Sequence, residues 1–274
     1  MSDYCEIAIA AEDAMHDILI AELAEIGYDG FEEFPGLLKA FVPEPDFIEN
    51  ELNILLNKYD IRYFKSIIKK QNWNAVWESN FEPVQVDDFV GVRASFHPSV
   101  SQVEHEIIIT PKMSFGTGHH ATTYMVMKLM QELDFHGKSV FDFGTGTGIL
   151  AILAEKLGAT QLLAVDNDDW CIENASENIA INKCNNIDLQ KIESLKLSRQ
   201  FEIIIANINR NIILDNIGEL RRALPVGSQL LLSGLLKEDE ADIIDVCHAL
   251  GLQHKKTLER SGWIALWFFL LIPG

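Results

Sequence analysis

The run from Val140 to Ile149, VFDFGTGTGI, constrains this chain more than any other stretch, because an apolar strand leads there into a glycine-rich turn and then a helical pattern. Gly144, Gly146 and Gly148 lack a Cβ, so the turn can be tight and the following helix can present N–H groups to a polar ligand. The pattern predicts a small-molecule site at the carboxyl end of this strand.

The spacing of the glycines discriminates between nucleoside ligands. A dinucleotide-binding turn is written G-x-G-x-x-G, and Ile149 holds the place of its third glycine. Asp142 precedes Gly144 by two residues, and Asp166 ends the next expected strand, where a carboxylate can accept hydrogen bonds from both ribose hydroxyls. These features favour S-adenosylmethionine over NAD. An NAD-dependent oxidoreductase and a non-catalytic cofactor-binding scaffold remain as alternatives.

The second half of the chain alternates strands and helices. Strands are expected at residues 139–143, 161–166, 187–190, 201–205 and 228–233, with helices at 149–157, 170–182, 212–224 and 238–250. Such alternation predicts a doubly wound, mostly parallel sheet. Two last strands, at 253–258 and 263–271, are joined through Arg260-Ser261-Gly262 and predict a C-terminal antiparallel hairpin that completes a seven-stranded sheet.

The first 70 residues follow a different order. A strand (5–10), a helix (13–26), two strands (28–33 and 37–42), a helix (47–59) and a strand (61–69) form a β-α-β-β-α-β pattern, which predicts a small α+β ferredoxin-like domain. Residues 71–112, with Trp73 and Trp77, are expected to be a connector that packs on one or both domains. The expected domains are therefore 1–70, 71–112 and 113–274.

Charge and composition limit the kinds of molecule that this chain is expected to bind. Residues 1–110 hold 21 acidic and 7 basic residues and so carry −14 of the net charge of −19. That field disfavours direct binding to nucleic acid and attracts basic partners, although acidity that only maintains solubility is an equal alternative. The longest apolar run, 263–272, is half of a membrane span and is expected to be a buried strand. Without a secretory leader, membrane span or C-x-x-C pair, we expect a cytoplasmic protein with reduced cysteines.

A second glycine-rich segment, Phe115-Gly116-Thr117-Gly118-His119-His120-Ala121-Thr122-Thr123, precedes a helical pattern at 124–133. Its adjacent histidines have no acidic or cysteine partner at helical spacing, so no metal site is expected. Together with FDFGTGTGIL, AVDND and ANI, this segment resembles the ribosomal protein methyltransferase family that modifies large-subunit ribosomal protein eleven. The similarity covers nearly the whole chain and includes the connector motifs WNAVW and FEP.

The resemblance implies a class I S-adenosylmethionine-dependent enzyme whose N-terminal domain recognises the substrate. By this resemblance, Thr123, Gly144, Asp166 and Asn207 are expected to contact the cofactor. The glycine-rich turn adds Asp142 and Gly146 to the expected cofactor-binding residues. The family loop usually has Thr and Pro where this chain has His119 and Ala121.

The implied reaction is transfer of methyl groups to lysine side chains or the N-terminal amine of a basic large-subunit ribosomal protein. Enzymes that methylate nucleobase amines usually carry Asn/Asp-Pro-Pro-aromatic after the fourth strand, and this chain reads Asn207-Ile208-Asn209-Arg210 there. Asn207 is the expected positioning residue, and the residues assign no general base.

Overall fold

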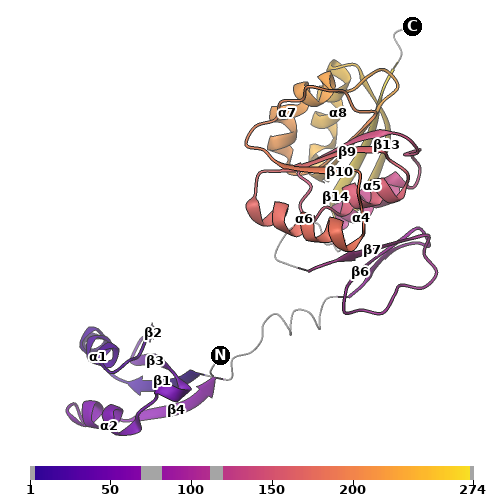
Figure 1. The fold of residues 1–274 in the computed structure, drawn as a ribbon. Helices are drawn as coiled ribbons and strands as arrows, with labels where there is room; N and C mark the ends of the chain where they lie inside the picture. Colours follow the sequence, from indigo (N-terminus) through magenta and orange to yellow (C-terminus); the bar gives the residue numbers. More distant parts are fainter. Residues whose placement is uncertain (1–3, 69–81, 112–119, 272–274) are drawn as a thin grey trace. The chain divides into compact units, whose positions relative to one another are not determined.

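A computed structural model describes residues 4–68, 82–111 and 120–271, which divide into two compact units, Met1–Asn80 and Phe81–Gly274 (Figure 1). The connector tryptophans Trp73 and Trp77 and the loop residues from Phe115 to His119 lie outside the described residues.

The first unit is a four-stranded antiparallel sheet covered by two helices. Its strand order is β2-β3-β1-β4. Apolar side chains alternate along the strands, so that Ile7 and Ile9 of β1 face Leu19 and Leu52 of the helices in one buried core. The ferredoxin-like prediction is confirmed. The elements are β1 (Tyr4–Ala10), α1 (Asp13–Glu25), β2 (Gly30–Phe34), β3 (Leu37–Pro43), η1 (Glu44–Asp46), α2 (Glu49–Asn57) and β4 (Tyr63–Ile68).

The second unit is built on a seven-stranded sheet of order β10-β9-β8-β11-β12-β14-β13. The first five strands in this order run parallel, and β14 pairs antiparallel with both β12 and β13. The expected mostly parallel sheet with a C-terminal hairpin is thus confirmed. Its strands are β8 (Ser139–Phe143), β9 (Gln161–Asp166), β10 (Ile187–Lys191), β11 (Ile203–Asn207), β12 (Gln229–Leu236), β13 (Leu252–Arg260) and β14 (Trp263–Leu270).

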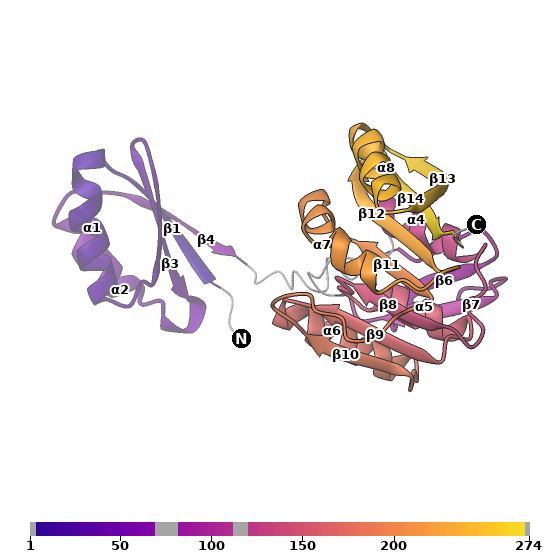
Figure 2. The ribbon, with the colours of Figure 1, turned by 90° about the horizontal axis from the view of Figure 1, so that it is seen from above.

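Helices cover both faces of this sheet, with α4, α5 and α6 on one face and α7 and α8 on the other (Figures 1 and 2). The two faces correspond to two separate apolar cores, one containing Met125 and Ile152 and the other containing Ile213 and Ile243. Every residue of the central strand β11 is buried, as expected of a strand that is covered on both faces. The helices are α4 (Ala121–Met130), α5 (Ile149–Lys156), α6 (Asp169–Ile181), α7 (Arg210–Arg222), η2 (Lys237–Asp239) and α8 (Glu240–Ala249).

Within the expected connector, residues 84–109 form a third, small sheet of order β5-β6-β7. β5 (Val84–Val86) is antiparallel to β6 (Val90–Ala94), which is parallel to β7 (His105–Ile109). Its buried side chains join the core on the face that α4 and α5 cover. This part of the chain therefore packs as an additional layer of the second unit.

The C-terminal hairpin turns at Ser261 and Gly262, whose φ angles of 53° and 78° suit a two-residue type I′ turn. The long apolar run is the buried strand β14, as predicted. Within the described parts of the chain, no helix combines the length and the apolar character that a bilayer crossing requires. All four cysteines are free thiols.

Candidate active site

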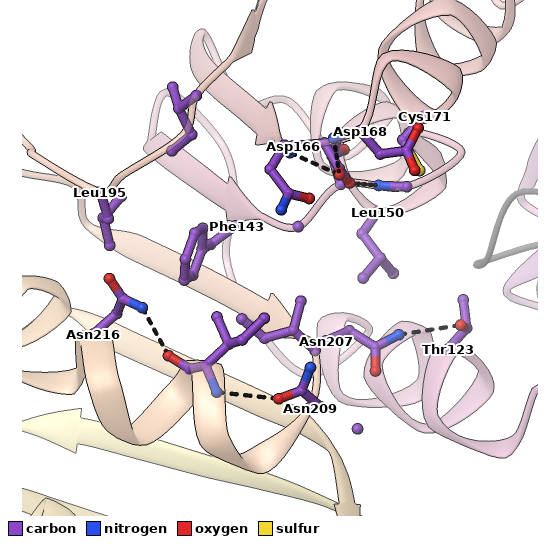
Figure 3. A pocket seen from close by; sticks show the side chains of 18 of the residues that line it. Thr123, Phe143, Leu150, Asp166, Asp168, Cys171, Leu195, Asn207, Asn209 and Asn216 are labelled. Carbon is purple, nitrogen blue, oxygen red and sulfur yellow. Dashed lines mark hydrogen bonds between the residues drawn. The ribbon is translucent and has the colours of Figure 1, made fainter.

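A cavity of about 670 Å³ opens at the carboxyl ends of the parallel strands, where an open α/β sheet binds its ligands (Figure 3). This volume falls within the range of small-molecule and cofactor sites. Five of the six residues expected from the sequence line the cavity: Thr123, Gly144, Gly146, Asp166 and Asn207.

The glycine turn forms one wall of the cavity. Gly144, Gly146 and Gly148 all have positive φ, at 76°, 56° and 80°, a backbone conformation that residues with a Cβ rarely adopt. The backbone N–H groups of Gly144 and Thr145 both donate to the Val165 carbonyl at 2.9 Å, which ties the turn to the neighbouring strand β9. Gly148 is the N-cap of α5, so the turn leads directly into a helix N-terminus.

Asp166 ends β9 and connects two loops through its carboxylate. Its Oδ2 accepts a hydrogen bond from Gly146 N–H at 2.9 Å, and its Oδ1 accepts from the N–H groups of Asn167 at 2.8 Å and Asp168 at 3.2 Å. These bonds fix the orientation of the carboxylate at the cavity wall.

Asp142, the sixth expected residue, lies beneath the turn and does not line the cavity. Its Oδ2 accepts a hydrogen bond of 2.6 Å from the Thr145 hydroxyl, and its Oδ1 has no hydrogen-bond partner. The pKa of Asp142 is raised to about 7, chiefly because burial disfavours the charged carboxylate; the bond from Thr145 opposes this rise and the nearby Asp166 charge adds to it. Asp142 thus braces the turn from inside the fold.

Asn207 ends the central strand β11 and reaches α4. Its amide Nδ2 donates to the Thr123 hydroxyl at 3.2 Å, and both side chains are buried (Figure 3). Its Oδ1 is buried without a hydrogen-bond partner. A buried carbonyl oxygen without a partner costs free energy, and at a cavity wall this oxygen is available to accept a hydrogen bond from a ligand.

Several cavity residues were not expected from the sequence. Trp263, at the start of β14, packs edge-on against His120, the N-cap of α4, with ring centroids 4.8 Å apart. Burial lowers the pKa of His120, so its imidazole is neutral at neutral pH. The two residues lie 143 positions apart in the sequence, and no local pattern relates them.

The loop after β10 supplies a further wall through Glu193, Ser194 and Leu195. It follows the third parallel strand, so the rule that ligands bind beyond the carboxyl ends of strands could have identified it. Gly234 in β12 and Cys171 in α6 also line the cavity. Burial, with the charges of Asp166 and Asp168, raises the pKa of Cys171 to about 11, so this thiol stays protonated.

The residues fit the cofactor expected from the sequence. The cavity offers a turn whose glycines at 144 and 146 carry no side chain, an acidic strand end and, at Asn207, a buried acceptor oxygen without a partner. Within the described parts of the chain, no three His, Cys, Asp or Glu side chains gather in a way that could hold a metal ion.

A family profile and individual relatives both match this chain and belong to the same protein family. The profile of ribosomal protein L11 methyltransferase (PrmA) matches residues 10–269. The ribosomal protein L11 methyltransferase of Porphyromonas gingivalis is 42% identical over 264 residues, which is 93% of this chain and 91% of that protein. The enzyme of the same name from Chlorobaculum tepidum is 35% identical over 276 residues, 96% of this chain and 95% of that protein.

Two solved structures are similar to the fold. The ribosomal protein L11 methylase of Lactobacillus delbrueckii subsp. bulgaricus superposes with a TM-score of 0.64 at 30% identity, over 70% of this chain and 100% of that chain. A methyltransferase from Pyrococcus furiosus superposes with a TM-score of 0.52 at 21% identity, over 61% of this chain and 90% of that chain, and supports the fold alone.

Proposed function

This chain belongs to the ribosomal protein L11 methyltransferase family, and from that premise we propose that it methylates lysine side chains or the N-terminal amine of ribosomal protein L11. The enzyme is an S-adenosylmethionine-dependent protein methyltransferase. The observation that carries the finer proposal is the buried, unpartnered Oδ1 of Asn207 at the cavity wall.

We propose roles for the other expected residues from their positions. Gly144 and Gly146 give the ligand close access to the backbone, and Asp166 accepts hydrogen bonds from the ribose hydroxyls. Thr123 holds the Asn207 side chain through its hydroxyl. Asp142 supports the turn without touching the ligand.

When bound, S-adenosylmethionine supplies a sulfonium methyl group that its positive charge already activates toward attack. The protein therefore needs to place a neutral amine in line with that methyl group and to keep water away. Asn207 Oδ1 suits the first task, because a carbonyl oxygen can accept a hydrogen bond from an amine N–H and leave the nitrogen lone pair free.

The aromatic pair of His120 and Trp263 favours the neutral form of the amine. Both rings line the cavity, and an apolar environment disfavours the ammonium form of an entering amine, which lowers its pKa. The neutral imidazole of His120 adds no positive charge that would repel the substrate.

The acidic N-terminal part suits a basic ribosomal protein as its partner. We propose that residues 1–70 recognise this protein and that residues 113–274 transfer the methyl group. Residues 71–112 are the connector between these two domains. Direct binding to nucleic acid or a membrane has no part in this proposal.

The experiment incubates the purified chain with L11 and S-adenosylmethionine and measures methylated L11 by intact-mass spectrometry. Asn207→Ala should lower kcat by about a hundredfold, within the range expected for the loss of one positioning interaction. Asn216→Ala is the matched control, because Asn216 also lines the cavity but its side chain donates to the Ile212 carbonyl of its own helix. Equal activity in both variants would refute the role of Asn207.

A further inference from the structure

Three asparagines follow one another at four-residue spacing along α6 and its C-cap: Asn174, Asn178 and Asn182. Residues at this spacing lie on one face of a helix. Asn174 and Asn178 are completely buried, and neither lines the cavity. Buried amide side chains on a helix have a high desolvation cost unless each is hydrogen-bonded, so their partners define what they do.

One set of partners is the outer edge of β7, which ends the small sheet. Asn182 accepts from Ile108 N–H at 3.0 Å and donates to the Ile108 carbonyl at 2.6 Å. Asn178 accepts from Thr110 N–H at 2.7 Å, and Asn174 donates to the Thr110 carbonyl at 3.2 Å. The amide side chains therefore occupy the place of a missing neighbouring strand.

The second partner belongs to the cofactor turn, and only Asn178 reaches it. Its Nδ2 donates to the Thr147 carbonyl at 2.8 Å, one residue before the N-cap of α5. The same helix closes on the turn beside this bond, because a Cβ on Gly148 would lie 3.3 Å from the Cβ of Ala175. The turn is thus held from behind by α6, on the side away from the cavity.

We propose that Asn178 is a positioning residue for the cofactor turn. Its amide side chain links the Thr147 carbonyl to the Thr110 N–H through one hydrogen bond to each, and so sets the position in which the turn binds S-adenosylmethionine. The inference depends on the cofactor site and not on which amine of the substrate is methylated. Asn182 bonds the N–H and carbonyl of Ile108 in β7 and the Asn178 carbonyl of its own helix, and among the described residues it makes no bond to the turn. We infer that Asn182 holds the small sheet.

The two asparagines therefore form a matched pair for mutation. Asn178→Ala and Asn182→Ala each remove a hydrogen bond to a partly buried backbone N–H group, that of Thr110 or of Ile108, and both should lower Tm. Only Asn178→Ala also removes the hydrogen bond to the Thr147 carbonyl, together with the bond from the same Nδ2 to Asn174 Oδ1. We expect its Kd for S-adenosylmethionine, measured by calorimetry on the full chain without any protein substrate, to rise about tenfold, while Asn182→Ala keeps the Kd within about twofold of the unmutated chain.

Steady-state kinetics give a second measurement, which would not change if Asn178 only stabilised the fold. In Asn178→Ala the KM for S-adenosylmethionine should rise by the same factor as the Kd, while kcat at saturating cofactor changes little. An unchanged Kd in Asn178→Ala, or an equal rise in both variants, would overturn the proposal. Because no protein substrate is present in the calorimetry, neither result bears on the methylation of L11.

Should Asn178→Ala fail to fold, the unmutated chain provides the test. The Thr110 and Ile108 amides both donate to asparagine side chains of α6, and only the partner of Thr110 also holds the turn. Saturation with S-adenosylmethionine should slow hydrogen exchange at Thr110 by about threefold more than at Ile108, as measured by NMR. Equal slowing at both amides would overturn the proposal.

Discussion

Gly234 approaches Ile208 so closely that a Cβ at position 234 would lie 2.2 Å from the Ile208 carbonyl oxygen. The Ile208 side chain also lies against Gly144, where an added Cβ would lie 2.2 Å from the Ile208 Cγ2 atom. The segment that carries Asn207 is therefore confined between two glycines from β12 and the cofactor turn. Because Ile208 directly follows Asn207, these close approaches restrict the position of the backbone that carries Asn207.

Gly234→Ala should displace the Ile208 backbone and Asn207 with it. We expect kcat/KM for methyl transfer to fall at least about tenfold, since a small misplacement of a positioning group has a large effect on rate. Gly227→Ala is the control, because Gly227 has a similar φ of 85° but nothing within 4 Å of its added Cβ. Both variants carry the strain of a left-handed alanine, about 1–2 kcal/mol. Similar activity in the two would show that the close approach is irrelevant.

Asp166→Asn should weaken binding of S-adenosylmethionine by roughly 1–3 kcal/mol, because it removes charge-assisted hydrogen bonds to the ligand. Asp168→Asn removes the same charge from the cavity wall, while asparagine preserves the N-cap of α6. Calorimetry on both variants separates a specific contact from a general loss of charge. The ribose assignment is wrong if Asp168→Asn weakens binding as much as Asp166→Asn.

Asp142 should make stability depend on pH. Its pKa rises from a usual value of 3.8 to about 7 in the folded protein, so the folded state retains a proton that the unfolded state has lost between those values. The stability that this carboxyl contributes is complete below pH 4 and is lost as the pH rises to about 7. Asp142→Asn still accepts from Thr145 but does not titrate.

We therefore expect Asp142→Asn to gain stability relative to the unmutated chain as the pH rises from 5 to 8, as measured by urea unfolding. Asp188→Asn, at an exposed position on β10, should give a constant difference over the same range. A constant difference for Asp142→Asn as well would show that the buried carboxyl does not hold the proton.

Removal of residues 1–70 should separate recognition from cofactor binding. This deletion takes away all described elements of the first unit and leaves both apolar cores of the second unit complete. The truncated chain should bind S-adenosylmethionine with unchanged affinity and should no longer methylate L11. Methylation of L11 at the full rate by the truncated chain would contradict a recognition role for this domain.

Local patterns were sufficient to predict most of the fold. Strands β8 and β9 begin and end where the sequence predicts, because each is a mostly apolar run whose carboxyl end is marked by glycine or by an acidic residue. The turn between Gly144 and Gly148 was recognisable for the same reason, since its positive φ angles require glycine. Features encoded by adjacent residues were thus accessible from the sequence.

Features that depend on contacts between residues far apart in the sequence could not be predicted from the sequence. His120 and Trp263 meet only because α4 packs beside β14. The three asparagines of α6 give no sign in the sequence of the strand edge that they bind, because β7 lies more than 60 residues earlier. The close approach of Gly234 to Ile208 likewise arises from the pairing of β11 with β12. Tertiary packing determines each of these relationships.

The central claim, methyl transfer to amines of L11, is tested most directly by blocking those amines. L11 is acetylated on its lysines and N-terminus, which turns nucleophilic amines into amides, and is then compared with untreated L11 in reactions containing trideuteromethyl-labelled S-adenosylmethionine. The account predicts that mass spectrometry finds labelled methyl groups on lysine or N-terminal nitrogen of untreated L11 and none on acetylated L11. Equal labelling of the two proteins, or no labelling of either by a chain that binds the cofactor, would contradict it.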